Sequence, residues 1–333
     1  MTALAPHLST FLRERLPETR GASIHTCDSY AYAFKLLLEF AAKRLRKTPS
    51  AIELEALDAT LVLAFLTHLE QKRGCSASTR NARLAAIRSF MRYAELGVPS
   101  ILEQSRRVLA IPMKRTDTKL VRHLSQQEME AILRAPDVKQ RDGIRDRAML
   151  HLAFAAGLRA TELVTLPLAQ VSMTGVPSVR IVGKGRKERA LPLWKSAADD
   201  LRAWLAVRGD ARSTELFTNA RGQAMTRSGF EYVLAKHVAA ATAVCPSLAS
   251  KTVSPHVLRH TCAMTILRAT GDIRKVSLWL GHADIKTTQM YLRADPAEKL
   301  EAITKVAEPH LARGRFRAPD KLIASLMPPR SRR

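Results

Sequence analysis

Apolar residues recur every three or four positions through most of the N-terminal third of the chain, a pattern that predicts helices. The stretch from Thr10 to Glu95 lacks the alternation typical of strands, and turn signals fall at Pro49 and Gly74. The last helix of this stretch has the clearest pattern, because Ser78 or Thr79 is placed to cap it and four apolar side chains form one stripe, namely Leu84, Ile87, Met91 and Ala94. We therefore expect a helical N-terminal domain.

The apolar period fades between Gly97 and Arg122, where prolines and charged residues replace it. Ser125 followed by Glu128 then has the spacing of a capping box, which marks the first helix of a second domain. The expected divisions are a helical domain over residues 1–112, a linker over 113–122, a second domain over 123–308 and a basic tail over 309–333.

The second domain is expected to combine helices with a short sheet. An apolar helix should run from Asp146 to Ala156, and Pro255 and Gly271 delimit another. Two runs with strand character, 178–182 and 189–193, flank a basic glycine-containing segment, which predicts a β-hairpin with a basic tip. The fold class that follows is mainly α with a small antiparallel β-sheet.

The charge of the chain indicates a polyanionic partner. Lysine and arginine total 54 against 30 aspartate and glutamate, which leaves a formal net charge of +24. The sequence has no apolar run of the roughly 20 residues that a membrane helix needs, and its start lacks a secretory-signal pattern. We therefore expect a cytoplasmic protein that binds a polyanion and no membrane. The 4 cysteines have no paired spacing, so reduced thiols are expected.

Four arginines lie off the apolar stripe of the last N-terminal helix, namely Arg80, Arg83, Arg88 and Arg92. A solvated polar face is one explanation for them. The scarcity of acidic residues before Glu95 favours the other, a surface that faces phosphates in the major groove. Arg186 and Lys187, at the tip of the expected hairpin, are the remaining candidates for DNA contact.

Residue types suited to phosphodiester chemistry follow one another through the second domain. Arg159 comes directly after the turn that ends an apolar helix. His256, Arg259 and His260 have the i, i+3 and i+4 spacing that puts side chains on one helical face. Tyr291 follows on a later helix. Each of these residues alone is more often structural than catalytic, so the interpretation depends on their joint order.

Five ordered segments resemble the conserved boxes of the tyrosine recombinases, the family of phage integrases and Xer recombinases. They are residues 147–163, 182–189, 255–260, 280–282 and 287–291. The resemblance covers residues 124–294 strongly and 78–93 more loosely. It implies a helical core-binding domain joined to a mixed α/β catalytic domain. It also implies an enzyme that cuts and rejoins specific sites in double-stranded DNA as a homotetramer on two sites, with no metal, ATP or other cofactor.

The resemblance gives the phosphate-binding and attacking residues their roles. Arg159 and Arg259 would fork onto the oxygens of the scissile phosphate, and His282 would add a hydrogen bond there. Tyr291 would attack the phosphorus, which produces a 3′-phosphotyrosine and releases a 5′-hydroxyl. Arginines would thus supply the positive charge that a metal supplies in other nucleases.

Proton transfer falls to other residues of the same boxes. His256 is the expected base for the tyrosine hydroxyl, and Lys184 is the expected acid for the leaving 5′-oxygen, with Lys187 as its rival. Glu162 and His260 are interpreted as supports that orient the arginines and the helix.

Three other functions agree with parts of the sequence. A type IB topoisomerase would use the same nucleophile but rejoin the original strand, and a catalytically silent DNA-binding protein would not need these residue types in this order. A zinc enzyme built on His256 and His260 is disfavoured, because Val257 stands where a metalloprotease needs glutamate. The basic linker and the extended tail favour an integrase or transposase of a mobile element over a housekeeping recombinase. The tail fits equally a segment that docks on a neighbouring protomer and a segment that binds DNA.

Overall fold

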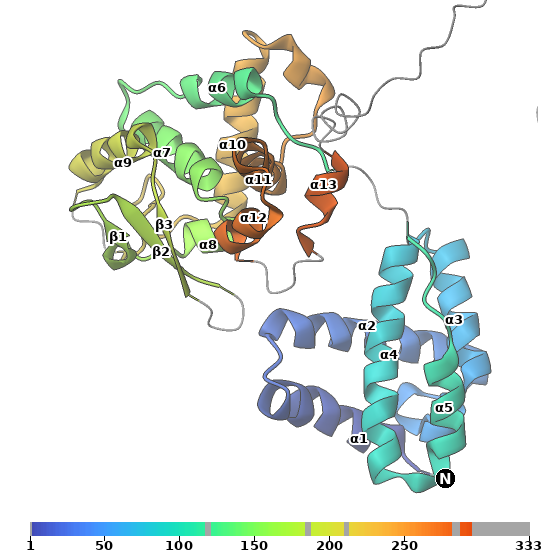
Figure 1. The fold of residues 1–333 in the computed structure, drawn as a ribbon. Coiled ribbons are helices and arrows are strands. Elements are labelled where there is room, and N and C mark those ends of the chain that lie inside the picture. Colours follow the sequence, from blue (N-terminus) through green and yellow to red (C-terminus); the bar gives the residue numbers. More distant parts are fainter. Residues whose placement is uncertain (1, 117–120, 184–187, 210–212, 282–286, 295–333) are drawn as a thin grey trace, which may run out of the picture. The chain divides into compact units, whose positions relative to one another are not determined.

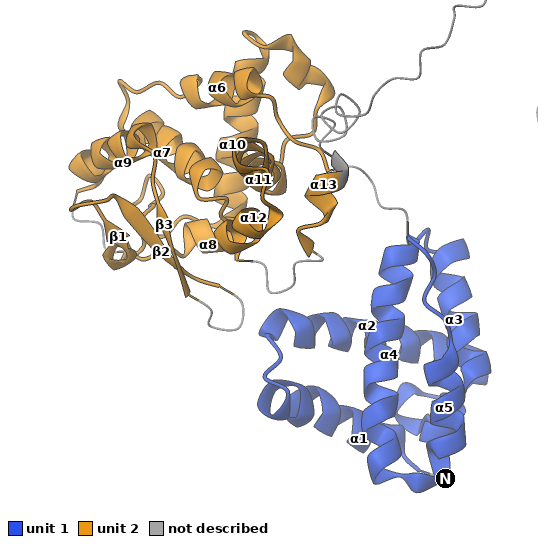
Figure 2. Cartoon of the chain, viewed as in Figure 1, with its two compact units in different colours: residues 1–118 blue, residues 119–333 orange. Residues whose placement is uncertain are grey.

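The computed structural model describes residues 2–116, 121–183, 188–209, 213–281 and 287–294. The chain divides into two compact units, residues 1–118 and 119–333 (Figure 2). Helices make up most of both units, and one three-stranded antiparallel sheet lies in the second (Figure 1). The expected fold class is confirmed. Within the described ranges, every helix falls short of the length and apolarity required to cross a bilayer.

The first unit is a set of helices joined by short turns. Its helices are α1 (Leu4–Thr10), the π-helix η1 (Phe11–Thr19), α2 (Ile24–Leu45), α3 (Ala59–Gln71), α4 (Ala77–Gly97) and α5 (Leu102–Ala110), with single 3-10 turns at η2 (Pro49–Ala51), η3 (Leu54–Ala56) and η4 (Pro99–Ile101). The expected stripe on α4 is confirmed, since all four of its apolar side chains are buried. The helix begins earlier than expected, because the hydroxyl of Ser76 accepts a hydrogen bond from the backbone N–H of Thr79 at 3.2 Å.

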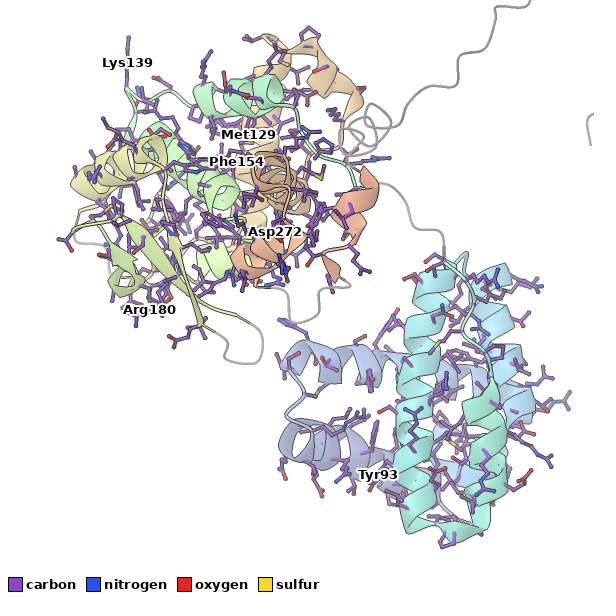
Figure 3. All side chains as sticks on the ribbon, in the orientation of Figure 1. Tyr93, Met129, Lys139, Phe154, Arg180 and Asp272 are labelled. Atoms are coloured by element: carbon purple, nitrogen blue, oxygen red, sulfur yellow. The ribbon has the colours of Figure 1, made fainter. Side chains whose placement is uncertain are left out.

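Aromatic side chains form the centre of this first core. The ring of Phe11 lies 5.4 Å from that of Phe90 and 5.4 Å from that of Tyr93, both on α4. Tyr93 lies near the C-terminal end of α4 (Figure 3). Phe34 of α2 packs edge-on against Phe90 at 5.3 Å. Because these rings fix the rotation of α4, they also fix the directions in which its arginines point.

In the second unit the small sheet lies at one side of a group of helices (Figure 1). Its elements are α6 (Gln126–Arg134), α7 (Arg141–Ala155), α8 (Ala160–Val164), η5 (Leu168–Gln170), β1 (Val171–Ser172), β2 (Ser178–Val182), β3 (Glu188–Pro192), α9 (Lys195–Arg208), α10 (Arg227–Thr242), η7 (Pro246–Ser250), α11 (Pro255–Thr270), α12 (Ile273–Leu280) and α13 (Met290–Ala294). Strands β2 and β3 pair from Ser178↔Pro192 to Val182↔Glu188. The two expected strands of the hairpin are therefore present, with β3 one residue earlier than predicted. The expected basic tip lies outside the described residues.

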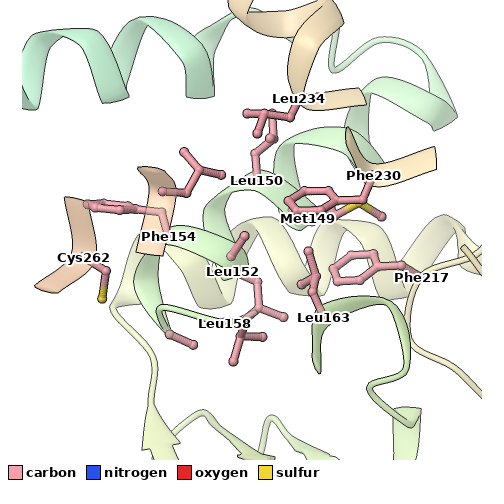
Figure 4. Close-up of a cluster of buried hydrophobic side chains, with 14 of the residues drawn as sticks. Met149, Leu150, Leu152, Phe154, Leu158, Leu163, Phe217, Phe230, Leu234 and Cys262 are labelled. Atoms are coloured by element: carbon pink, nitrogen blue, oxygen red, sulfur yellow. The ribbon is translucent and has the colours of Figure 1, made fainter. Parts of the chain in front are cut away.

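Helix α7 forms the centre of the second core. Its side chains Met149, Leu150, Leu152 and Phe154 are buried among Leu163, Phe217, Phe230 and Leu234 from neighbouring segments (Figure 4). The helix starts at Arg141 rather than at the expected Asp146, because its first turn is charged and stabilised by an Arg145–Asp142 ion pair of 3.0 Å instead of by apolar packing. It ends at Ala155, close to the expected position.

A buried carboxylate fixes α7 against α10. Asp146 Oδ1 accepts hydrogen bonds from Arg145 Nη2 at 2.7 Å and Nε at 3.0 Å, and its Oδ2 lies 2.8 Å from His237 Nε2. Burial raises the pKa of Asp146, but the hydrogen bonds from His237 and Arg145 outweigh burial and hold that pKa below its usual range. The network thus orients the helix whose far end leads into the candidate site.

Candidate active site

The turn after α7 positions Arg159 on rigid backbone. Gly157 has a φ of +57°, and a Cβ there would come within 2.7 Å of Leu280 Cδ2, so both conformation and space require glycine. Arg159 is the N-cap residue of α8, and its backbone N–H donates to Glu162 Oε2 at 3.0 Å. The Arg159 side chain keeps 37% of its surface exposed, so it can still reach a ligand.

Glu162 lies among three guanidinium groups. Its Oε1 accepts from Arg159 Nη1 at 2.6 Å, its Oε2 accepts from Arg189 Nη2 at 2.8 Å, and Arg259 Nη1 is 3.9 Å from Oε2. Burial raises the pKa of Glu162, but hydrogen bonds from Arg189 and the Arg159 backbone prevail and lower it. One negative charge among three positive ones leaves a surplus of positive charge for an anionic ligand.

Arg259 joins two glycine turns. Its Nη1 donates to the Gly157 carbonyl at 2.5 Å and its Nη2 to the Leu280 carbonyl at 2.8 Å, and Gly281 beyond Leu280 has a φ of +64°. Burial, followed by repulsion from Arg159, lowers the pKa of Arg259 to about 10, so the group stays charged at neutral pH. A guanidinium has five N–H donors, and these two bonds leave others for a phosphate.

Tyr291 lies in a small core between α11, α12 and α13. Its side chain is 1% exposed and packs with Val121, Met264 and Leu280. Its hydroxyl is 2.9 Å from His260 Nδ1. Burial raises the pKa of Tyr291 to about 12, while burial and the nearby charges of His256 and Arg259 lower the pKa of His260 to about 4. Both partners are therefore neutral at pH 7.

The two histidines of this helix occupy different environments. His256 is exposed, and its ring centre is 6.4 Å from that of His260. Sequence reasoning assigned the proton-accepting role to His256 and a supporting role to His260. The structure instead brings His260, one turn further along α11, against the tyrosine hydroxyl.

Four expected site residues cannot be placed. Lys184, Arg186, Lys187 and His282 lie outside the described residues. Arg189, in contrast, contacts Glu162 directly and was not singled out from the sequence. The signal that could have identified it is a charged residue at a position of β3 where alternation with Leu191 calls for an apolar one.

The arginines of α4 do not share one face. Arg80 is the least suited of the four to contact DNA, because its side chain is 4% exposed and its Nη1 donates to the Pro112 carbonyl at 3.1 Å. Arg83 packs over the Tyr32 ring at 5.0 Å, and the Nε atom of Arg88 is buried. Arg92 is exposed but lies on the side of the helix opposite Arg83, since nine residues at about 100° each leave a half-turn. DNA contact by these three remains a prediction.

Comparison with known proteins finds a matching family model for each unit. A family model described as the phage integrase family matches residues 122–298, and a second, the phage integrase N-terminal SAM-like domain, matches residues 9–96. The chain is 44% identical over 324 residues to the candidate integrase/recombinase y4rC of Sinorhizobium fredii, covering 97% of this chain and 98% of that one. It is 34% identical over 312 residues to the tyrosine recombinase XerC of Pelotomaculum thermopropionicum, covering 91% and 98%.

Solved structures share the fold. The XerH site-specific recombinase bound to palindromic difH substrate, in a post-cleavage complex, has a TM-score of 0.67 at 23% identity over 89% of this chain and 84% of that one. The lambda integrase dimer bound to a COC′ core site has a TM-score of 0.65 at 15% identity over 89% and 78%.

Proposed function

Because the chain belongs to the phage integrase family of tyrosine recombinases, we propose that Tyr291 is the nucleophile with which it opens one strand at each DNA site. As a member of that family it is a site-specific recombinase that breaks and rejoins DNA. The strongest support for Tyr291 is the position of its hydroxyl, 2.9 Å from Nδ1 of His260, which lies on the same helix as Arg259.

Arg159 and Arg259 would bind the scissile phosphate. They come from separate segments, α8 and α11, yet both contact Glu162 and the Gly157 turn brings them together. Two guanidinium groups on one phosphate would stabilise the charge that builds as phosphorus becomes five-coordinate. Arginine provides this stabilisation without a bound metal ion.

The tyrosine proton would pass to His260 rather than to His256. With the proton of neutral His260 on Nε2, its Nδ1 accepts the hydrogen bond from the Tyr291 hydroxyl. The positive charge of Arg259 is one cause of the low pKa of His260, and a bound phosphate would offset that charge and make His260 a better base. DNA binding would thus prepare the proton acceptor.

The bond changes balance without an energy source. The Tyr291 oxygen forms a bond to phosphorus as its proton moves to His260, and the bond from phosphorus to the 5′-oxygen breaks. That oxygen takes a proton from Lys184, with Lys187 as the alternative donor. Attack by a 5′-hydroxyl reverses the sequence, so the phosphotyrosine keeps the bond energy of the cut strand and rejoining needs no ATP.

Exchange of partners requires more than one protomer. A 5′-hydroxyl from a second duplex must replace the original one, which calls for several active sites on two DNA sites and supports a homotetramer. The basic linker and tail favour the integrase of a mobile element as the biological setting. Inverted repeats in the DNA that flanks the gene would be the expected substrate.

Trapping on nicked DNA tests the proposed nucleophile. Duplexes made from the flanking DNA, each with a nick near the cleavage position, lose their short 5′-hydroxyl fragment and cannot be rejoined. In EDTA and without nucleotide, the unaltered protein should accumulate a covalent DNA complex. Tyr291→Phe should form none while its DNA affinity stays nearly the same, because the change removes one oxygen and no charge. A covalent complex of Tyr291→Phe, or a requirement for added metal, would overturn the proposal.

A sulfur substitution tests the leaving-group acid. When sulfur replaces the bridging 5′-oxygen, the leaving group needs no proton. Lys184→Ala should therefore regain much of its cleavage on this substrate, whereas Arg159→Ala should not. If only Lys187→Ala is rescued, the acid is Lys187.

A further inference from the structure

We propose that Arg189 is a positioning residue for DNA cleavage: it shares the Glu162 carboxylate with Arg159 and so leaves the Arg159 guanidinium available to the phosphate. The inference rests on the proposed function and extends it to a residue whose side chain is largely buried against Glu162.

Arg189 lies where the sheet should be apolar. It pairs with Ile181 across the hairpin, and both it and Leu191 point to the buried face, while Arg180 and Ala190 point the other way. The Arg189 side chain is 9% exposed, and within the described part of the chain its buried Nε has no hydrogen-bond partner. Burying a guanidinium costs free energy unless it is paired, so the partner of Arg189 indicates its role.

That partner is the carboxylate next to the phosphate-binding arginine. Arg189 Nη2 donates to Glu162 Oε2 at 2.8 Å, and Nη1 lies 3.4 Å from Oε1, the oxygen that also accepts from Arg159. Arg189 also packs against the Gly281 turn, where a Cβ would come within 3.0 Å of its Nη1. One side chain therefore connects β3 with α8 and with the turn after α12.

Charge balance gives this contact its effect on cleavage. Three cations face Glu162, namely Arg159, Arg189 and Arg259. With Arg189 present, its hydrogen bond takes up much of the negative charge of the carboxylate, and it is the largest influence that lowers the pKa of Glu162. Without Arg189, the carboxylate would hold Arg159 more strongly and compete with the phosphate for the same guanidinium.

Arg189→Met tests the role, with Arg180→Met as the matched control. Both changes remove one arginine from the same sheet, but Arg180 is exposed (Figure 3) and its position in β2 puts it on the face opposite Arg189. On the duplex recovered in the trapping experiment, Arg189→Met should form the covalent complex about 10- to 100-fold more slowly, the cost of a misplaced catalytic group. DNA affinity should change no more than in Arg180→Met, which should cleave at the unaltered rate. Equal rates in the two variants would overturn the proposal.

A second substitution separates charge balance from simple structural support. In Arg189→Met, replacing Glu162 by the neutral, equally sized glutamine should restore part of the lost rate, because the competing charge disappears. If Arg189 only supported the structure, the double variant would be slower than Arg189→Met, because the effects of the two substitutions would add. Arg189→Lys, which keeps a positive charge beside Glu162, should lose less than Arg189→Met and covers the case in which the methionine variant fails to fold. A double variant no faster than Arg189→Met, or a lysine variant as slow as it, would contradict the proposal.

These experiments distinguish a failure of the proposed function from a failure of the Arg189 role alone. If the unaltered protein forms no Tyr291-dependent complex, the proposed function fails and the role of Arg189 fails with it. If the complex forms and glutamine gives no rescue, only the role of Arg189 is lost.

Discussion

The two units bury charge differently. Among the described residues, the first unit buries one charged side chain, Arg80, and its core consists of aliphatic and aromatic groups. The second unit buries several charged or histidine side chains, namely Glu128, Arg145, Asp146, His151, Arg208, His237 and Arg259. Burying such a group costs free energy unless it is paired. The second unit therefore depends on specific ion pairs and hydrogen bonds that an apolar core would not need.

The comparison shows what these buried charges do. Apolar packing fixes where a helix lies, but it does not orient a guanidinium. In the second unit, the Asp146 network holds α7 against α10, and the end of α7 leads directly to Gly157 and Arg159. The cluster around Glu162 then aims the arginines themselves. The core of the first unit is formed by aliphatic and aromatic side chains, and the described residues contain no comparable network of buried charges there.

The largest effect is expected at His260. If His260 accepts the Tyr291 proton, His260→Gln should slow covalent complex formation by about 100- to 10,000-fold, the usual contribution of general acid–base catalysis. His256→Gln is the matched variant on the same helix and should lose less. The rates are measured on the nicked duplex in a single turnover. A greater loss in His256→Gln would return the proton-accepting role to His256.

The pH dependence gives a sharper version of this prediction. A base works only when unprotonated, and His260, with a pKa of about 4, stays neutral well below pH 7 in the DNA-free protein. At limiting DNA, where the rate reports the free protein, complex formation should stay level from about pH 7.5 to about pH 5.5. A decline centred near the ordinary histidine pKa of about 6.5 would contradict the assignment.

A smaller effect, on stability, is expected at Asp146. Asp146→Ala removes the buried carboxylate that pairs with His237 and with the Nε and Nη2 atoms of Arg145, which should lower the free energy of unfolding by about 3–5 kcal/mol. The chain has 3 tryptophans, Trp194, Trp204 and Trp279, all in the second unit, so tryptophan fluorescence during urea unfolding reports that unit alone. Asp199→Ala is a control, because Asp199 pairs with Arg202 at an exposed position. Equal losses in the two variants would show that buried pairing does not stabilise this unit.

A further prediction concerns DNA contact by the first unit. Replacing Arg83 and Arg88 together by alanine should flatten the slope of log affinity against log salt concentration by about one to two units, since each phosphate contact contributes roughly 0.9. The slope is measured by titrating the duplex at several salt concentrations. An unchanged slope would mean that these arginines form only a solvated face.

The smallest effect on DNA binding is expected at Arg80. Its guanidinium is buried and donates to Pro112, so Arg80→Met should leave the salt slope unchanged. The same change should lower the stability of the first unit by about 1–3 kcal/mol, because the Pro112 carbonyl loses its donor. Far-UV circular dichroism during unfolding measures that loss. A flatter slope would show that Arg80 reaches phosphate after all.

Local signals in the sequence predicted much of the fold. The α4 stripe, the Ser125 capping box, the glycine at the end of α11 and the two hairpin strands depend on nearby residues, and the structure confirms each of them. The early start of α7 was missed because its first turn is stabilised by ion pairs, which apolar periodicity does not register.

The site was harder to predict where tertiary contacts decide. The buried position of Arg80 depends on a carbonyl 32 residues away, and the contact between His260 and Tyr291 spans 31 residues. Helical spacing puts His256 and His260 on one face, but only the packing of α13 decides which of them meets the tyrosine. Arg189 was not predicted because its role depends on contact with Glu162, which lies in another element of the fold.

Mapping the covalent adduct identifies the attacking residue without any substitution. The complex trapped on the nicked duplex is digested with protease and nuclease, and the peptide that carries a nucleotide is sequenced by mass spectrometry. We expect one modified residue, Tyr291, joined through its phenolic oxygen to the 3′-phosphate of the cut strand. A nucleotide on another residue, or a link to the 5′ end, would contradict it.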